Sequence, residues 1–424
     1  MRSPTSPHGI SAFSEKPKVI AATPLIHFCK LLSPRSTVLY TCSPTCKDPR
    51  HQHAATNDST SWKLGRPARA ASANKTRSAG ASVRTSTSSA PVIDVHCHYL
   101  NPAISAKTAD LQMSKHDPSV IYANELTRET NVAQMKDRAS KLTGTDERLQ
   151  DMDRMGIDIQ AISPAPFQYF YFVEAERGAA LAREVNEGIA RLVADTPARF
   201  VGMGSVPLQN AELAVQEMDH AIKVLGLRGI EINTNVNGRN LTDPQLGLEP
   251  FFARANELGA VLFLHPVGFS EGARLTNHYF NNVIGNPLDT TIAVSHLIFD
   301  GVVDRYPKIK FIAAHGGGYV SHYWARMDHA WRARPDCRTV IRRAPSTYLK
   351  KFYVDTVVFA PEMLRHLVDT FGAERVLLGS DYPYDMGEED PRGLIGAVKG
   401  LSRADRSLIE GGNAAKLFTV KQSR

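Results

Sequence analysis

"VIDVHCH", residues 92–98, is a short apolar run that ends in two histidines, His96 and His98. It is the first of eight such runs. Short runs that are this rich in Val and Ile are typical of strands buried on both faces of a parallel sheet. The other seven are "IDIQAISP" (157–164), "FVGMGSVP" (200–207), "LRGIEINT" (227–234), "AVLFLHP" (260–266), "IKFIAAHGGG" (309–318), "FYVDTVV" (352–358) and "VLLGSDYP" (376–383).

Helical patterns lie between these runs, with examples at 210–226, 248–259, 290–307 and 361–375. Buried strands that alternate with helices indicate an α/β protein with a parallel sheet. Eight units over about 330 residues fit a (β/α)8 TIM barrel, which usually has roughly 200 to over 400 residues. An open, doubly wound sheet is the alternative, but no G-x-G-x-x-G turn follows the first run. We therefore predict a barrel domain at 91–424.

One connection of this predicted barrel is unusually long. Residues 99–156 separate the first two apolar runs, whereas about 2–6 residues are common in such loops. Loops at the carboxyl ends of barrel strands form the active site. We therefore expect a long insertion after strand 1 that forms a lid or wall of the site.

Residues 1–90 differ from the rest in composition. They hold thirteen Lys and Arg and three Asp and Glu, which gives a net charge of +10. Residues 91–424 hold 37 Lys and Arg and 40 Asp and Glu, which gives a net charge of −3. The rest of the chain therefore lacks the excess of positive charge that is typical of nucleic-acid-binding proteins, and no nucleic-acid partner is expected. A Ser/Arg-rich segment low in aromatic residues predicts a disordered basic N-terminal extension. An organelle transit peptide and a wrongly chosen start codon remain alternatives.

Cysteine usage and hydropathy bear on location. Outside the extension the chain has only Cys97 and Cys337, too few for a disulfide framework, which favours a reducing, cytoplasmic location. The longest apolar run, 19–32, is interrupted by Pro24, His27 and Lys30. It falls short of the ~20 residues that cross a bilayer, so no membrane partner is expected.

Polar residues end several of the apolar runs. His96 and His98 end the first, His265 the fifth, His315 the sixth and Asp381 the eighth. The carboxyl ends of barrel strands meet at one rim, and residues two apart on a strand share a face. Three imidazoles and one carboxylate suit Zn or a similar divalent ion, with an open position for water or substrate.

Other residues received a structural interpretation or stayed open. The fourth run, "GIEINTN", has no lysine to carry a bridging carbamate, so one metal ion is expected rather than two. Asp94 either contacts a metal ligand or ends a turn. His51 and His53 repeat the two-residue spacing without a strand, so they are predicted to be solvated. Helical patterns hold His220, His322, His329 and His366, which are interpreted as structural.

The motif "HGGG", residues 315–318, has two interpretations. Three glycines let the backbone approach a ligand and open a helix with free N–H groups. The alternative is a tight turn, which needs about one glycine, so three in a row beside His315 favour the ligand-binding interpretation. Arg326 follows His315 by eleven residues and is either a surface charge or a bidentate partner of a substrate carboxylate.

Taken together, "DVHCH", "LFLHP", "HGGG" with Arg326, and "LLGSDYPY" resemble the metal-dependent amidohydrolase superfamily, in the branch containing aminocarboxymuconate-semialdehyde decarboxylase. The resemblance covers about residues 92–420. It implies one divalent metal, Zn or alternatively Mn, held by His96, His98, His265 and Asp381. It also implies that His315 is the acid/base residue.

The resemblance further implies a homodimer, in which Arg326 reaches the substrate of the neighbouring subunit. For a second substrate arginine, Arg138 is the nearest candidate and Lys141 the next. The implied activity is non-oxidative decarboxylation of a small carboxylated aromatic or muconate-semialdehyde-type substrate. A hydrolase of a lactone or amide on the same barrel, in which Asp381 passes a proton, is the alternative. A non-catalytic metal- or carboxylate-binding protein is the third.

Overall fold

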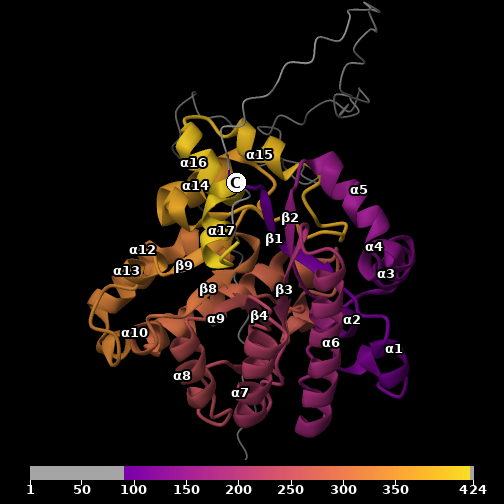
Figure 1. Ribbon diagram of the computed structural model, residues 1–424. Helices are drawn as coiled ribbons and strands as arrows, with labels where there is room; N and C mark the ends of the chain where they lie inside the picture. Colours follow the sequence, from indigo (N-terminus) through magenta and orange to yellow (C-terminus); the bar gives the residue numbers. More distant parts are fainter. Residues whose placement is uncertain (1–89, 421–424) are drawn as a thin grey trace, which may run out of the picture. The chain divides into compact units, whose positions relative to one another are not determined.

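Eight parallel strands form the centre of the computed structural model, which describes residues 90–420 (Figure 1). The predicted extension, with His51 and His53, therefore lies outside the described residues apart from residue 90. Seven of the strands lie within their apolar runs, and β1 extends one residue beyond its run, to Tyr99. The strands are β1 (Ile93–Tyr99), β2 (Ile159–Pro164), β3 (Phe200–Gly204), β4 (Gly229–Ile232), β7 (Val261–Leu264), β8 (Lys310–Ala313), β9 (Phe352–Asp355) and β10 (Val376–Leu377).

The sheet closes into a barrel between its first and last strands. Its order is β1-β2-β3-β4-β7-β8-β9-β10, and each pair is parallel. The backbone N–H of Val95 donates to the carbonyl of Leu378 at 2.9 Å, and that of His98 donates to Tyr382 at 2.8 Å. Closure leaves no free sheet edge, and the predicted (β/α)8 barrel is confirmed.

Asp94 contributes to this closure. Its buried carboxylate accepts hydrogen bonds from the Ser380 backbone N–H (3.1 Å) and hydroxyl (2.6 Å) and from the Gln160 amide (3.2 Å). It therefore joins β1 to β2 and to the segment after β10. Its Oδ1 atom also accepts from the His96 backbone N–H at 3.1 Å. Asp94 therefore supports the barrel wall and contacts the main chain of a predicted metal ligand, but not its ring.

Helices surround the strands (Figure 1). Both faces of the sheet are buried, because Val261 and Phe263 join one apolar cluster while Leu262 and Leu264 join another. Gly301, with φ of 75°, separates α9 from α10 within the helix predicted at 290–307. The outer helices are α6 (Ala175–Asp195), α7 (Ala211–Asp219), α8 (Glu249–Leu258), α9 (Asn286–Phe299), α10 (Val302–Arg305), α12 (Val320–Ala333), α13 (Ser346–Leu349), α14 (Pro361–Phe371), α15 (Pro391–Ala397), α16 (Arg403–Ser407) and α17 (Asn413–Leu417).

The long insertion after β1 consists of short helices. They are α1 (Ile104–Lys107), α2 (Pro118–Ile121), α3 (Glu125–Asp137), α4 (Ala139–Thr143) and α5 (Asp146–Met155). Buried Arg148 of α5 donates to the His98 carbonyl at 2.5 Å and to the Gln160 amide oxygen at 3.0 Å. The insertion is thereby fixed to the barrel wall beside the histidines of β1.

Asp151 of α5 provides a second, pH-dependent attachment. Its carboxylate accepts hydrogen bonds from Lys141 (2.7 Å) and from the Tyr382 hydroxyl (2.9 Å), and it pairs with Arg154. Burial opposes the charge of Asp151, but Lys141, Tyr382 and Arg154 outweigh it and lower its pKa. The ionised form is therefore stabilised in the folded protein.

We expect Asp151→Asn to lower the free energy of unfolding by about 1–3 kcal/mol at pH 7, the usual worth of hydrogen bonds to a charged group. Because the folded-state pKa of Asp151 lies below the unfolded value of ~3.9, this stabilisation is complete well above that pH. It is lost as the pH falls through the folded-state value. Urea unfolding of both proteins at several pH values measures this, and a difference that stays constant into acid would contradict it.

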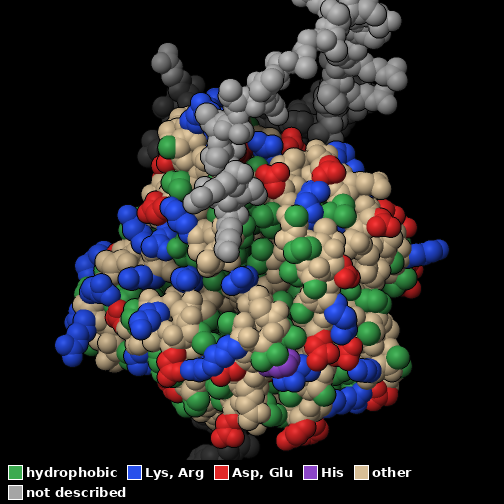
Figure 2. Space-filling view, in the orientation of Figure 1, with side chains coloured by type: hydrophobic (Ala, Val, Ile, Leu, Met, Phe, Trp, Pro, Cys, Tyr) green, Lys and Arg blue, Asp and Glu red, His purple; other side chains and the backbone are tan. Residues whose placement is uncertain are grey.

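The surface around α12 and α13 is rich in arginine. Figure 2 shows Lys and Arg side chains gathered on the side of the molecule where Figure 1 labels these helices. Two arginines of this part of the chain are paired, Arg334 with Asp336 and Arg343 with Asp304.

Between residues 90 and 420, no helix combines the length and the apolar character needed to cross a membrane.

Candidate metal centre and adjoining cavity

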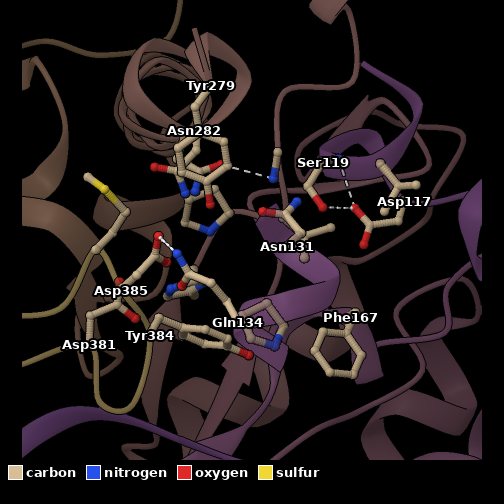
Figure 3. A pocket seen from close by; sticks show the side chains of 18 of the residues that line it. Asp117, Ser119, Asn131, Gln134, Phe167, Tyr279, Asn282, Asp381, Tyr384 and Asp385 are labelled. Carbon is tan, nitrogen blue, oxygen red and sulfur yellow. Dashed lines mark hydrogen bonds between the residues drawn. The ribbon is translucent and has the colours of Figure 1, made fainter. Parts of the chain in front are cut away.

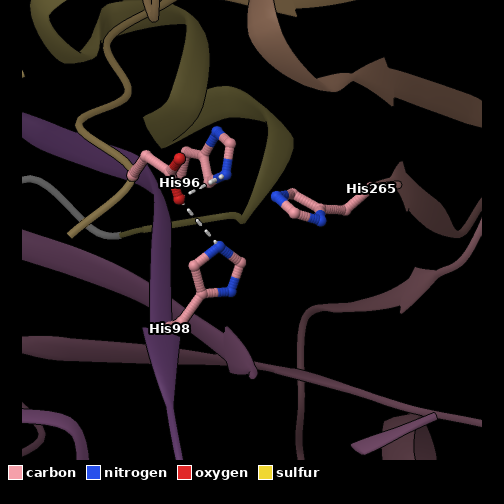
Figure 4. Close-up of side chains that lie close together, drawn as sticks. His96, His98 and His265 are labelled. Carbon is pink, nitrogen blue, oxygen red and sulfur yellow. Dashed lines mark ion pairs between the residues drawn. The ribbon is translucent and has the colours of Figure 1, made fainter. Parts of the chain in front are cut away.

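The four predicted metal ligands lie together at the carboxyl ends of three strands. His96 and His98 belong to β1, His265 directly follows β7, and Asp381 follows β10. One ligand atom from each lies within 4.8 Å of the other three, and Figure 4 shows the three imidazoles facing a common space. Within residues 90–420 this is the only such cluster, which agrees with a single metal ion.

The donor atoms of this cluster fit a divalent cation. The Asp381 Oδ1 atom lies 3.3 Å from His96 Nε2 and 3.2 Å from His98 Nε2. These three atoms and His265 Nε2 are buried, and none has a hydrogen-bond partner among the described residues. Buried polar atoms are normally paired. Four that converge without partners are explained by a bound ion with nitrogen and oxygen ligands.

Hydrogen bonds at the other ring nitrogens orient the two histidines of β1. His96 Nδ1 lies 2.7 Å from Asp355 Oδ2, and His98 Nδ1 lies 3.0 Å from the Pro164 carbonyl oxygen. An acceptor at Nδ1 favours the tautomer that carries its proton there, which leaves Nε2 free to bind a metal. In the neutral form of either ring, Nε2 is therefore unprotonated and faces the cluster.

The electrostatics of Asp381 and His265 favour the protonation states that bind a metal. Burial opposes a charge on His96, but Asp381 and Asp355 outweigh it and hold the pKa of His96 well above its usual range. Burial raises the cost of a charge on Asp381, but His96, His315 and His98 outweigh this cost and hold its pKa well below the ordinary value. Burial, together with the neighbouring imidazoles of His98 and His96, lowers the pKa of His265 well below its usual range. A carboxylate and a neutral imidazole are the forms that coordinate metals.

His315 lies beside the cluster without being part of it. Its Nε2 atom is 3.6 Å from Asp381 Oδ2, and its Nδ1 atom has no hydrogen-bond partner among residues 90–420. His315 has φ of 55° and Asp381 has φ of 60°, both in the left-handed region. Non-glycine residues adopt this conformation rarely, and such strain is concentrated at functional sites.

The expectation that "HGGG" presents free N–H groups to a ligand is wrong. The Gly316 N–H donates to Asp355 at 2.9 Å, and the Gly318 N–H donates to the His315 carbonyl at 3.1 Å. The glycines are required by the backbone instead, because all three have positive φ. A Cβ atom on Gly318 would lie 2.2 Å from the Pro287 carbonyl oxygen.

A cavity of about 320 Å³ opens onto the cluster. His265, His315 and Asp381 form its floor, and the insertion supplies a wall that includes Arg138. Figure 3 shows Gln134 of α3 directed at Asp385, to which it donates at 2.7 Å. Asp117 adds an acidic side chain to the lining, in addition to Asp385. The other lining residues are hydroxyl, aromatic, amide, apolar or glycine: Ser119, Val120, Asn131, Met135, Pro166, Phe167, Pro266, Val267, Gly268, Tyr279, Asn282, Asn286, Tyr384 and Met386.

The two other predicted cations are placed differently. Arg326 is exposed on α12 and does not line the cavity of its own chain. Lys141 donates to Asp151 at 2.7 Å and does not line the cavity either. Of the three basic candidates, only Arg138 lies at the cavity.

Three further residues at the site were missed in the sequence. Tyr384 lines the cavity with a buried hydroxyl that has no partner among the described residues, and buried Asp355 lies behind His96. Glu231 of β4 is buried, accepts from the Tyr169 hydroxyl at 2.8 Å, and lies 3.8 Å from His98 Nδ1. For Glu231 the signal in the sequence was a charged residue inside "GIEI", and for Asp355 it was the acidic residue at the end of "FYVD".

Comparison with known proteins places this geometry in a family. The amidohydrolase family model matches residues 93–420. The chain is 39% identical over 280 residues to 2-amino-3-carboxymuconate-6-semialdehyde decarboxylase of Dictyostelium discoideum, covering 66% of this chain and 77% of that protein. Its fold resembles 5-carboxyvanillate decarboxylase from Sphingomonas paucimobilis, with a TM-score of 0.68, 25% identity, and coverage of 78% and 100% of the two chains.

A second solved structure shares the fold. Dihydroxybenzoic acid decarboxylase from Polaromonas sp., solved with manganese and the inhibitor 2-nitroresorcinol, has a TM-score of 0.67 at 23% identity, covering 79% and 98% of the chains. The family match spans the whole described barrel, from β1 to the residues after α17. The chain therefore belongs to the amidohydrolase family, in the branch that contains aminocarboxymuconate-semialdehyde decarboxylase.

Proposed function

We propose that the protein is a metal-dependent non-oxidative decarboxylase, a carboxy-lyase that acts on a small carboxylated aromatic or muconate-semialdehyde-type substrate. The observation that carries this proposal is the 39% identity to a decarboxylase of which the chain covers 77%. The chain also brings four donor atoms together beside an acid/base candidate. The cavity of about 320 Å³ is the size of a pocket for one small ligand.

His96, His98, His265 and Asp381 would hold the metal, and we propose zinc as the native ion. Three imidazole nitrogens and one carboxylate oxygen form a donor set suited to zinc, whereas manganese is bound in the Polaromonas decarboxylase. When bound, a divalent ion supplies a Lewis acid beside the substrate. Elemental analysis of protein purified without added metal distinguishes the two ions.

His315 is proposed as the residue that moves the proton. Its ring lines the cavity beside Asp381, so a substrate in the cavity lies within its reach. Decarboxylation requires one proton at the carbon that bears the carboxylate. When that carbon is protonated, its bond to the carboxylate breaks, CO2 leaves, and the bonding electron pair restores conjugation in the product. A positioned acid/base residue typically contributes about 10²–10⁴-fold to such a step.

The substrate would be held by the cavity walls. Arg138 is the cationic side chain of the cavity wall and is proposed to bind a substrate carboxylate. Phe167, Tyr279 and Tyr384 offer aromatic surfaces for a planar substrate (Figure 3). Because Asp381 pairs with His315, it is proposed both to bind the metal and to orient the acid/base residue.

We further propose that the enzyme is a homodimer in which Arg326 completes the site of the neighbouring subunit. Arg326 is exposed on α12, where Tyr323 and Trp324 are also exposed, by 57% and 37%. Exposed aromatic side chains next to an arginine are enriched at protein interfaces. Sedimentation analysis tests the dimer directly.

Mixing two inactive variants tests whether Arg326 acts across the interface. We expect Arg326→Ala to reduce kcat/KM by about 10–150-fold, the loss of one charged hydrogen-bonded contact of ~1.5–3 kcal/mol. Subunit exchange with an equal amount of His315→Gln should then restore activity to about a quarter of wild type. Random exchange makes about half of the dimers mixed, and each symmetric mixed dimer has one of its two sites with both residues intact. No recovery on mixing would contradict a shared site.

The proposed reaction is tested with a panel of carboxylated phenols, muconate semialdehydes and lactones. Metal-loaded protein is incubated with each compound while CO2 and pH are followed. CO2 release identifies the carboxy-lyase. Acid release without CO2 would instead identify the hydrolase that uses the same barrel.

A further inference from the structure

Asp355 is a buried carboxylate at the end of β9, outside the cluster of metal ligands. It is completely buried, and it does not line the cavity. It lies between His96 of β1 and the backbone of residues 315–316, which follow β8. A fully buried charge is costly unless it is well paired, so Asp355 requires several hydrogen-bond donors.

Four hydrogen bonds satisfy the two oxygens of Asp355. Its Oδ2 atom accepts from His96 Nδ1 at 2.7 Å and from the His315 backbone N–H at 3.0 Å. Its Oδ1 atom accepts from the Gly316 N–H at 2.9 Å and from the Val357 N–H at 3.1 Å. One carboxylate therefore contacts both a proposed metal ligand and the backbone that carries the proposed acid/base residue.

The contact with His96 determines what that ring can offer a metal. Because Asp355 accepts at Nδ1, the Nδ1 atom carries the proton and Nε2 keeps its lone pair. An amide nitrogen facing Nδ1 would favour the opposite tautomer, with the proton on Nε2. His96 could not then bind a metal through the atom that faces the cluster.

The contacts with residues 315 and 316 hold a strained backbone. His315 has φ of 55° and ψ of 50°, a conformation that residues other than glycine rarely adopt. Such strain persists only where neighbouring contacts impose it. The two N–H groups donate to different oxygens of one carboxylate, which fixes the orientation of this peptide segment and directs the His315 ring at Asp381.

We propose that Asp355 is a positioning residue that sets the metal-binding tautomer of His96 and the strained backbone of His315 at once. His96 lies on β1 and His315 follows β8, and these two strands are not adjacent in the sheet. Asp355 contacts the ring of His96 and the backbone of His315. The role of Asp355 at His96 requires only that the cluster binds a metal. Its role at His315 rests on the proposed decarboxylase function.

Asp355→Asn tests this role, because it replaces two acceptor oxygens with one. In either orientation of the amide, its NH2 group faces two donors that the carboxylate had satisfied. We expect the Kd for zinc to rise about 10–100-fold, the usual effect of losing a hydrogen-bond partner behind a ligand. At saturating zinc and substrate, kcat should fall by about 100-fold with little change in KM, since a misplacement near 1 Å can have this effect.

Glu217→Gln is the matched control. Glu217 is also a buried carboxylate that accepts two side-chain hydrogen bonds, from Arg183 and Asn186, and it lies on α7 away from the cavity. We expect this variant to lose thermal stability but to keep the zinc affinity and kcat of wild type. If Asp355→Asn behaves in the same way, Asp355 is only a structural residue and the proposal is overturned.

The wild-type protein provides a measurement that does not depend on a variant folding. In ¹⁵N NMR spectra of zinc-loaded protein with ¹⁵N-labelled histidine, His96 should show a protonated Nδ1 and a zinc-bound Nε2. The signals of His96 are identified as those that are absent from the spectrum of His96→Gln. Zinc bound through Nδ1, or a proton on Nε2, would overturn the proposal. A protein that binds zinc as expected yet releases no CO2 from any compound would contradict the decarboxylase function and leave the role of Asp355 at His96 intact.

Discussion

The double substitution His96→Ala with His98→Ala is expected to abolish metal binding and activity together. It removes two of the three imidazoles of the cluster and leaves His265 and Asp381, too few ligands for a stable site. Turnover should fall by at least about 10³-fold, equivalent to roughly 4 kcal/mol of transition-state stabilisation. Elemental analysis after reloading with zinc measures the metal per chain, and CO2 release measures the rate.

The chain contains a matched control for this experiment. His51→Ala with His53→Ala changes two histidines with the same two-residue spacing, in a segment that carries no apolar strand pattern. We expect the control to keep a full complement of metal and wild-type turnover. Retention of metal by the His96/His98 variant would refute the assignment of the cluster as the metal site.

The second large effect is expected at His315. Glutamine at this position keeps a polar side chain of similar length but cannot exchange a proton near neutral pH. We expect His315→Gln to lower kcat by about 10²–10⁴-fold, the range for a positioned acid/base group. Bound metal should remain at wild-type levels, because His315 is not one of the four clustered ligands. Steady-state kinetics and metal analysis on the same preparation separate the two properties.

His296→Gln serves as the control for that variant. His296 lies on α9, pairs with Asp300 at 2.9 Å, and does not line the cavity. It should retain wild-type kcat. Loss of metal from His315→Gln would make His315 a ligand instead of an acid/base residue, and equal kcat in both variants would exclude a catalytic role.

The barrel was predictable because hydrophobic burial leaves a periodic trace in the sequence. Seven of the eight strands lie inside the apolar runs that predicted them, and β1 ends one residue beyond its run. The four clustered residues were predictable for a related reason. Polar side chains at the same end of parallel strands must meet at one rim once the sheet closes. The position of each residue at the end of its apolar run was therefore sufficient to predict that His265 and Asp381 lie beside His96 and His98.

Contacts that cross the barrel were beyond such reasoning. Asp355 and His96 are 259 positions apart, and their contact depends on how β9 lies relative to β1 in the closed sheet. "HGGG" was misinterpreted because glycine content does not reveal whether positive φ or ligand access requires it. The proposed role of Arg326 depends on a second subunit, which the sequence of one chain does not describe.

The separation between the rim of the barrel and the insertion has an evolutionary consequence. The four clustered residues come from strand ends whose geometry is fixed by the closed sheet, whereas Asn131, Gln134 and Arg138 come from a single inserted segment after β1. Substitutions in that segment can alter which molecule enters the cavity without moving the clustered ligands. A duplicated gene could therefore diverge toward new substrates by drift in residues 131–138 alone, while selection preserved the barrel and its clustered ligands.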